Sequence, residues 1–442
     1  MKKWIGAAFL VLVLAAAGIP FARGIVVKEI VEDAVRDINR EYQGPGMGMT
    51  VDILSYHRDF LTSRIEWELD LGSLSSLYGI DSVKFTENVD HGFVRTVSTT
   101  SLEKNKWYSD FVDQKLSGQD PLSIVNTYRV SGEVESKWTV EEFSFAGKGK
   151  TVDVNPGKMT VNLDRGMNHI RSDMNWQGMQ VPGEFGMENL TMTSGMKHIS
   201  GRIWDGSASC RIETVRAEDG ETRLELDQFA CKVTPSFEKT ANTLSIEVLC
   251  RADRIEADSQ KMDDASMTVA VNHIDVDRYK AFLKLWSEAV AGILENVDQN
   301  AVNNNGRLDK ELKRRMGRAG PRMAAACEKL LTKGLEIRIS DVHAVFPRGD
   351  VTGDIMVKLK RDMTFMQFIP IAVTPSAALA VFSLKSDFRL PYRMAGSPET
   401  LLSPLYPGMQ TGLFVKEGDD LVHNAETRDG KLFLNGKEVR LQ

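Results

Sequence analysis

The chain has 442 residues, of which 42% are hydrophobic and 26% are charged, and its formal net charge is −6 at pH 7. These proportions are typical of a folded protein and exclude a wholly disordered chain. The negative charge argues against a nucleic-acid partner, because such a protein needs a basic surface to offset the phosphates. Four cysteines are too few for a disulfide-built scaffold, but they allow one or two bridges.

The N-terminus has the pattern of a membrane anchor. Lys2 and Lys3 precede an uncharged run from Trp4 to Ala22, and a helix of that length spans about 30 Å, close to the thickness of a bilayer core. We therefore expect residues 1–23 to form a single inner-membrane anchor, with the lysines in the cytoplasm and the body of the chain in the periplasm. A signal peptide cleaved near "LAAAG" is the alternative, and it exports the body as well.

Residues 24–44 predict a juxtamembrane helix that continues from the anchor. Its apolar residues recur at helical spacing and mark one stripe. They are Ile30, Val31, Ala34, Val35 and Ile38. The turn-forming stretch "QGPGMG" ends this helix.

Residues 45–277 predict a long antiparallel β-meander, in which each strand pairs with the next. Short segments of alternating apolar and polar residues follow one another, separated by turn clusters such as "EDGE" and "EKTAN". The alternation gives each strand one apolar and one polar face. It is clearest at Leu224 and Leu226, at Leu244, Ile246 and Val248, and at Met267, Val269 and Val271.

Helices and then strands are predicted after the meander. Apolar residues at a 3.6-residue period mark a helical segment over 278–335, with Asp277 as the expected N-cap and a break at Gly317–Pro321. Residues 336–442 predict a C-terminal β region, with a short helix near 398–415 and a terminal hairpin closed by Asn435 and Gly436. The fold class is therefore α+β and mostly β, with an N-terminal transmembrane helix and helices inserted after the meander.

Cys210, Cys231 and Cys250 are predicted to lie in one row across three neighbouring strands. A turn centred on Gly220–Glu221 pairs Cys210 with Cys231, whereas a turn centred on Asp219–Gly220 pairs it with Phe229. The next turn brings Cys231 close to Cys250. One disulfide between Cys231 and either neighbour, or buried free thiols, are both compatible with this pattern, and export would permit oxidation.

No motif supports an enzyme, a cofactor or a metal site. The seven histidines form no HExxH or other closely spaced ligand pair, and neither a phosphate loop nor a nucleophile elbow is present. Methionines are frequent between residues 159 and 196, where they favour an adaptable apolar surface, in a core or facing lipid. We therefore assign no catalytic, cofactor-binding or metal-binding residue.

Three short stretches resemble the YdgA-like family of bacterial envelope proteins. The first is "YHRDFLTSRIEWEL", with Tyr56, Arg58 and Ser63; the second is "DHGFV", with His91 and Gly92; the third is the C-terminal "RDGKLFLNGKEV". The resemblance implies an N-terminal anchor, a periplasmic β-rich body and no established catalytic residue. His91 is expected to be a satisfied turn histidine.

Together these patterns predict an envelope maintenance or assembly factor that acts through protein contacts, with a homodimer or another envelope protein as partner. The alternative is a lipid-handling β-groove, since a one-sided meander must cover its apolar face and acyl chains are one possible cover.

Overall fold

We describe the protein from a computed structural model. The structure describes residues 22–40, 48–75, 80–93, 95–103, 106–147, 149–220, 222–258, 260–294, 310–367, 371, 374–394 and 412–440. The chain divides into two compact units. The first unit comprises Met1–Gln177, Thr193–Ile203 and Trp286–Pro321, and the second comprises Gly178–Met192, Trp204–Leu285 and Arg322–Gln442.

The described part of the chain begins with a helix over residues 22–40, which overlaps the range 24–44 predicted for the juxtamembrane helix. The expected anchor over residues 1–23 lies almost entirely outside the described residues. Among the helices that are described, none is both long enough and apolar enough to cross a bilayer.

Mostly β structure follows, as predicted, and the 22 strands of the described residues belong to one sheet. In the first unit the strands are β1 (Thr50–Arg58), β2 (Thr62–Asp70), β3 (Ser82–His91), β4 (Thr96–Leu102), β5 (Leu122–Tyr128), β6 (Val134–Val140), β7 (Phe143–Gly147), β8 (Lys150–Val154), β9 (Gly157–Leu163) and the start of β10 (His169–Val181). The helices among them are η1 (Gly72–Leu74) and α3 (Lys106–Lys115).

The strands of the first unit pair antiparallel in the order β1–β2–β3–β4–β5–β6–β9–β10. β7 and β8 form a hairpin in which β8 also pairs with β10, and β6 pairs with β9 and not with the next strand. The prediction that every strand pairs with the next was wrong at this point. The helix α3 also interrupts the predicted meander, and its sequence signal was missed.

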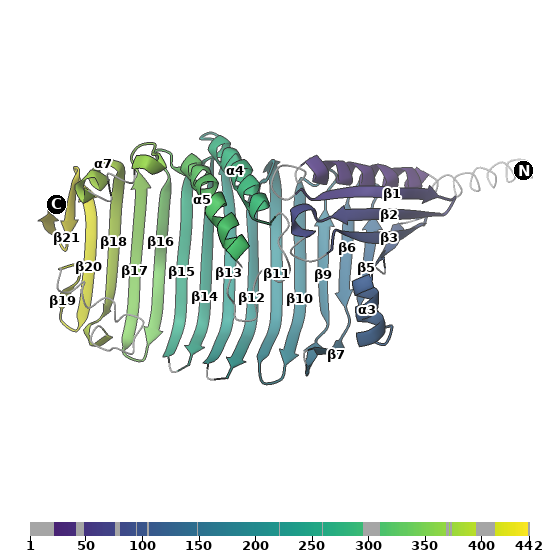
Figure 1. Ribbon diagram of the computed structural model, residues 1–442, viewed down its shortest axis with the longest axis horizontal. Helices are drawn as coiled ribbons and strands as arrows, with labels where there is room; N and C mark the ends of the chain where they lie inside the picture. The colour runs from purple at the N-terminus through teal and green to yellow at the C-terminus, as the bar shows by residue number, and fades with distance from the viewer. Residues whose placement is uncertain are drawn as a thin grey trace, which may run out of the picture. The chain divides into compact units, whose positions relative to one another are not determined.

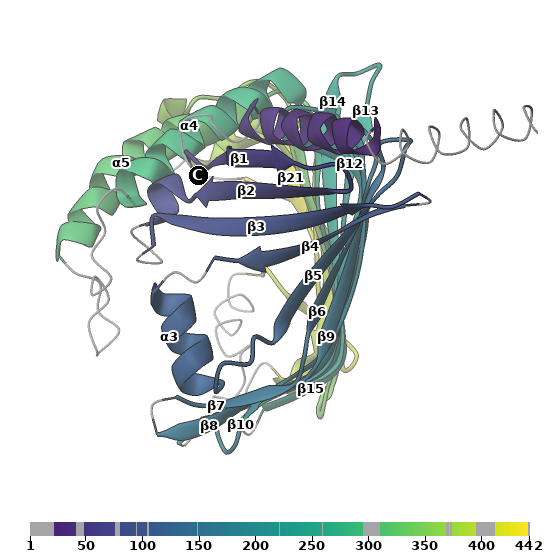
Figure 2. The same cartoon turned by 90° about the vertical axis from the view of Figure 1, so that its right-hand side faces the viewer.

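The helix of residues 22–40 runs alongside β1 (Figure 2) and packs against residues of β2, β3 and β5. Val27 from the helix packs with Ile65 of β2, Val89 of β3 and Tyr128 of β5, all of which are buried. Asn39 holds the C-terminal part of the helix, since its side chain makes two 2.7 Å hydrogen bonds with the backbone N–H and carbonyl of Val51. Ile30 and Val31 of the predicted apolar stripe pack against this core.

The strands from β11 to β15 are the longest, with 15 to 17 residues each, and those that follow are shorter. The strands from β11 onward are β11 (Phe185–Ser200), β12 (Ile203–Asp219), β13 (Thr222–Glu238), β14 (Thr243–Ala257), β15 (Gln260–Asp275), β16 (Glu336–Phe346), β17 (Gly349–Leu359), β18 (Phe382–Pro391), β19 (Val415–Glu417), β20 (Asp420–Arg428), β21 (Lys431–Leu434) and β22 (Lys437–Val439). The helices are α4 (Val276–Leu294), α5 (Lys310–Leu330), η2 (Phe365–Gln367), η3 (Pro375–Ala377), α7 (Ala378–Val381) and η4 (Tyr392–Met394). In the second unit, β12 to β18 lie side by side (Figure 1).

Two details of the helical segment differ from prediction. The N-cap of α4 is Asp275 and not Asp277, because the Asp275 carboxylate accepts a 2.9 Å hydrogen bond from the backbone N–H of Arg278. α5 also runs through the expected break, with Pro321 inside the helix. The short helix expected near 398–415 falls mostly on residues outside the described part of the chain.

The terminal hairpin is confirmed. β21 pairs with β22 through Leu434 and Lys437, and Asn435 and Gly436 form the two-residue turn between them. Their φ values are +49° and +75°, the left-handed conformations that such a turn requires.

A line of left-handed residues crosses the long strands of the second unit. Gln228 in β13 and Asp264 in β15 lie on either side of Asp253 in β14, with φ values of +51° and +46°. A left-handed residue interrupts the pleat of a strand. The apolar alternation of β13 accordingly changes phase at this line, from even-numbered Leu224 and Leu226 to odd-numbered residues beyond it.

Candidate functional site

Three cross-strand rows of apolar side chains form one face of the second unit between β12 and β18; we call this the apolar face. Residues paired on adjacent antiparallel strands point to the same side of a sheet, so each row can be followed through the register. The first row contains Ala208, Val233, Val248, Val269, Ile339 and Ile355. The second contains Pro235, Ile246, Val271, Ile337, Val357 and Leu384. The third contains Cys210, Cys231, Cys250 and Met267.

The apolar face is only partly covered. Val233 is 37% exposed, Met267 41% and Ile337 47%, although core side chains of a packed sheet are normally buried. The row that lies between the first two apolar rows points to the opposite face of the sheet and is largely polar. Its members include Glu247, Arg338 and Lys385. An apolar surface several strands wide is thus left in contact with water.

The third row confirms the predicted placement of the cysteines. The register pairs Cys210 with Cys231 and Cys231 with Cys250, so the turn centred on Gly220–Glu221 is the one observed. All three are free thiols, and Cys250 donates to the sulfur of Cys231 at 2.9 Å. Burial, followed by the hydrogen bond from Cys250, raises the pKa of Cys231 to about 11. The disulfide itself stays a prediction.

The family-motif residues of the first unit meet in a buried cluster. Ser63 of β2 and His91 of β3 are 4% and 2% exposed, and Ser63 Oγ lies 2.7 Å from His91 Nε2. The hydroxyl of Tyr56, on β1, is 3.3 Å from Ser63 Oγ and donates to the carbonyl of Gly24 at 3.0 Å. His91 Nδ1 is buried without a hydrogen-bond partner, so the expectation of a satisfied turn histidine was wrong.

This cluster fixes the first turn of the helix of residues 22–40. The Arg23 guanidinium donates to the carbonyl of Gly92 at 3.0 Å. A Cβ at Gly24 would lie 2.9 Å from Arg58 Cδ and 3.1 Å from His91 Nε2, so only glycine allows this approach without displacing a neighbour. The buried Ser63–His91 pair, with Tyr56, therefore serves as a clamp on the helix.

Because His91 is buried and its Nδ1 atom has no hydrogen-bond partner, we expect the folded protein to lose stability at acidic pH. Burial, and secondarily the positive charge of Arg58, lower the pKa of His91 below its ordinary value of 6.5. The unfolded chain then binds a proton more readily than the folded one, so stability is fully present above the ordinary value and is lost as pH falls toward the folded-state pKa. We expect the free energy of unfolding, measured by urea titration, to decrease on acidification from about pH 7.5 to 5.5.

His91→Gln is expected to flatten that pH dependence because glutamine does not titrate. His57→Gln is the matched control, since His57 is an exposed histidine of β1 in the same unit. An equal change of slope in both variants would contradict the assignment to His91.

A second buried polar network lies beside this clamp. The carboxylate of Glu87, which is 4% exposed, accepts from the Tyr128 hydroxyl at 2.6 Å, from Asn126 Nδ2 at 3.1 Å and from Ser98. Ser136 in turn donates to the Asn126 carbonyl oxygen at 2.6 Å. The network joins β3, β4, β5 and β6, and desolvation raises the pKa of Tyr128 well above its ordinary value.

The second unit contains a similar serine–histidine pair, which the sequence analysis missed. Ser386 Oγ of β18 lies 2.7 Å from His423 Nε2 of β20, and His423 Nδ1 is 2.8 Å from the carbonyl of Leu413. Asn435 donates to the carbonyls of Gly412 and Leu413 at 3.0 and 3.3 Å. The predicted motif position Asn435 thus helps to hold the segment before β19, while Gly436 completes its turn.

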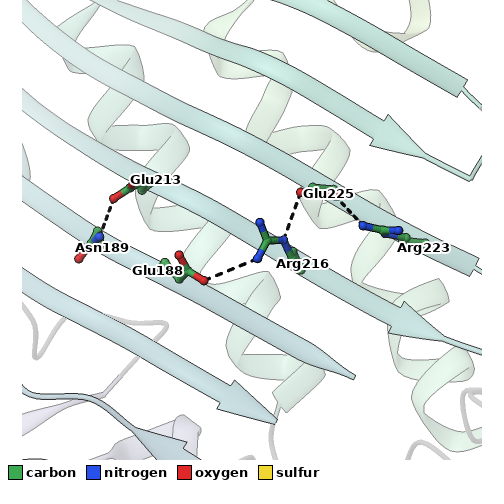
Figure 3. Close-up of polar contacts among 6 residues, drawn as sticks. All are labelled: Glu188, Asn189, Glu213, Arg216, Arg223 and Glu225. Atoms are coloured by element: carbon green, nitrogen blue, oxygen red, sulfur yellow. Dashed lines mark hydrogen bonds and ion pairs between the residues drawn. The ribbon is translucent and has the colours of Figure 1, made fainter. Parts of the chain in front are cut away.

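An ion-pair ladder joins β11, β12 and β13 (Figure 3). Arg216 contacts Glu188 at 3.7 Å and Glu225 at 3.1 Å, and Arg223 contacts Glu225 at 2.9 Å. The hydrogen bond from Arg216 is the main cause that lowers the pKa of Glu225. The ladder borders a cavity of about 380 Å³, but its charges neutralise one another, and exposed pairs of this kind add little stability.

Comparison with known proteins gives a family and no closer relative. A family model described as a bacterial protein of unknown function (DUF945) matches residues 1–442. No curated protein matches the chain, and no solved structure matches it. In the part of the chain that the structure describes, no group of three or more His, Cys, Asp or Glu residues is placed to hold a metal ion.

Proposed function

We propose that this chain, which belongs to the bacterial family of unknown function DUF945, binds lipid acyl chains on the apolar face of its second unit. The proposed setting is the periplasm, with the chain held at the inner membrane by the uncharged segment Trp4–Ala22. The motifs around Tyr56, His91 and Asn435 support placement in a YdgA-like branch of the family.

The observation that carries the proposal is the partial exposure of the rows on the apolar face. Each half-exposed Val, Ile or Met side chain gains roughly 1 kcal/mol when a ligand removes it from water. Val233, Met267 and Ile337 lie on β13, β15 and β16, so one extended ligand that crosses these strands is able to cover all three. The apolar face offers a ligand hydrophobic area without a charged group in its first two rows.

Acyl chains fit this surface better than a folded partner does. A methylene chain has no polar group to satisfy, and each buried CH₂ contributes about 0.8 kcal/mol. A protein interface, by contrast, usually combines an apolar centre with a polar rim and about one hydrogen bond per 100–200 Å². Protein contacts, with an envelope partner or a second copy, are the competing function.

The test is phospholipid retention by the full chain. We expect wild-type protein, purified from membranes in mild detergent, to carry phospholipid in stoichiometric amount, as quantified by mass spectrometry of the extract. Ile337→Asp is expected to lower the retained lipid about tenfold, because placing a carboxylate in the row costs at least 1.4 kcal/mol of binding free energy.

Arg338→Asp is the matched control. Arg338 is exposed on the same strand and points to the opposite face, so its replacement is expected to leave lipid retention unchanged. A wild-type protein that carries no lipid and forms a stable dimer would contradict the lipid proposal and favour the protein-contact function. Equal lipid loss in both variants would also contradict it.

A further inference from the structure

Four hairpin turns lie at one end of the sheet in the first unit. They connect β1 to β2, β3 to β4, β5 to β6 and β9 to β10, and we call them the turn edge. The register places them together, since Thr96 pairs with Tyr128, Tyr128 with Val134 and Val134 with Leu163. The first two turns adjoin in the same way, because Thr62 pairs with Asp90.

Three of these turns expose large apolar side chains to water. In the first turn Phe60 is 52% exposed and Leu61 51%; in the second Phe93 is 56% exposed; in the third Val130 is 68% exposed. Turns normally carry small or polar residues, because their side chains face solvent. Burial inside the unit does not explain these residues, so a partner surface outside it is the better explanation.

An arginine lies in or directly beside each turn: Arg58 ends β1, and Arg95, Arg129 and Arg165 lie in the other three turns. Acidic residues accompany them: Asp59 in the first turn, Asp90 near the end of β3, Glu133 in the third turn and Asp164 in the fourth. Arg129 pairs with Glu133 at 3.5 Å, while Asp164 makes its contact with His169 at 2.8 Å. The combination of apolar tip and flanking arginine is suited to the headgroup region of a bilayer.

The start of the helix of residues 22–40 is fixed at this same edge. Arg23 donates to the carbonyl of Gly92 in the second turn, and Gly24 packs against Arg58 beside the first. The uncharged run Trp4–Ala22 immediately precedes Arg23 in the sequence. The C-terminal end of this run is therefore next to the turn edge.

From these placements we propose that the turn edge of the first unit contacts the phospholipid bilayer directly. Phe60, Leu61, Phe93 and Val130 enter the interface between headgroups and acyl chains, and the exposed Arg95 beside Phe93 contacts a lipid phosphate. This contact fixes the orientation of the first unit on the membrane, which a single anchor leaves free. It goes beyond lipid binding on the apolar face, and it involves different residues in a different unit.

The test uses photo-crosslinking of the full chain in vesicles of phosphatidylethanolamine and phosphatidylglycerol. Benzoylphenylalanine replaces Phe60, Phe93 or Val130, and in control variants it replaces Leu54 or Met316. The controls are exposed apolar residues of the first unit outside the turns, at 49% and 47% exposure. All five positions are at the surface, so each variant is expected to fold, and its unfolding transition confirms this.

We expect lipid adducts, detected by mass spectrometry, at the three turn positions in several-fold excess over Leu54 and Met316. We also expect the yield at Phe93 to rise with the phosphatidylglycerol fraction, and Arg95→Glu to reduce that rise. Absence of adducts at the turns, or equal yields at the controls, would overturn the proposal. These outcomes are independent of lipid retention on the apolar face, since Ile337→Asp leaves the turn edge intact.

Discussion

Replacing Glu87 with leucine is expected to lower the free energy of unfolding by about 3–5 kcal/mol, the cost of removing one partner from a buried charged or hydrogen-bonded group. The carboxylate accepts from Tyr128, Ser98 and Asn126 inside the first unit. Leucine fills a similar volume but accepts no hydrogen bond. The Tyr128 hydroxyl would lose its 2.6 Å acceptor in a place that water does not reach. Urea unfolding monitored by circular dichroism measures the change.

Tyr128→Phe is the matched control, because it removes a donor and leaves the carboxylate with its other two partners. Its expected cost is about 1 kcal/mol, that of an ordinary buried hydrogen bond. The double variant should lose less than the sum of the two single losses, since the orphaned hydroxyl is absent. Strict additivity, or a loss below about 1 kcal/mol for Glu87→Leu, would show that the network does not stabilise the unit.

Local patterns were sufficient to predict most of the strands. Apolar residues at period two identify a strand wherever one face is apolar, and Asn435–Gly436 identifies a tight hairpin because both residues tolerate a positive φ. The arithmetic that places Cys210 opposite Cys231 also places Arg216 opposite Glu225, because both pairs of numbers have the same sum. The Arg216–Glu225 pair of the ion-pair ladder could therefore have been predicted from the sequence, although it was missed.

The buried polar contacts could not be predicted from the sequence. Glu87 lies in "TENVD", which has the composition of an exposed strand, and its burial arises only when β3, β4 and β5 assemble around it. His423 contacts Ser386, which lies 37 residues earlier in the sequence, and no motif connects the two. The change of phase at Gln228 also has no local signal, because glutamine seldom adopts a left-handed conformation.

Oxidation is expected to join Cys231 to one neighbour in the row and to raise the free energy of unfolding by about 3 kcal/mol. Either bridge closes a loop of roughly 20 residues, and that closure removes a corresponding amount of entropy from the unfolded chain. With oxidised glutathione as the oxidant, the two thiols lose two electrons and two protons, and two molecules of reduced glutathione are released. Cys250 is the expected partner, since its sulfur already contacts Cys231 at 2.9 Å.

The pKa of about 11 at Cys231 makes this bridge slow to form at neutral pH, because a thiolate is the attacking species and few Cys231 thiols are ionised there. The rate should therefore increase as the buffer pH is raised. Non-reducing peptide mapping identifies the bridge, and urea unfolding with and without reductant measures its effect. Cys250→Ser should redirect Cys231 to Cys210, whereas Cys231→Ser should abolish both bridges. Three unmodified thiols after prolonged oxidation of folded protein would show that the strand spacing does not allow the bond, and that the row contributes to the fold by packing alone.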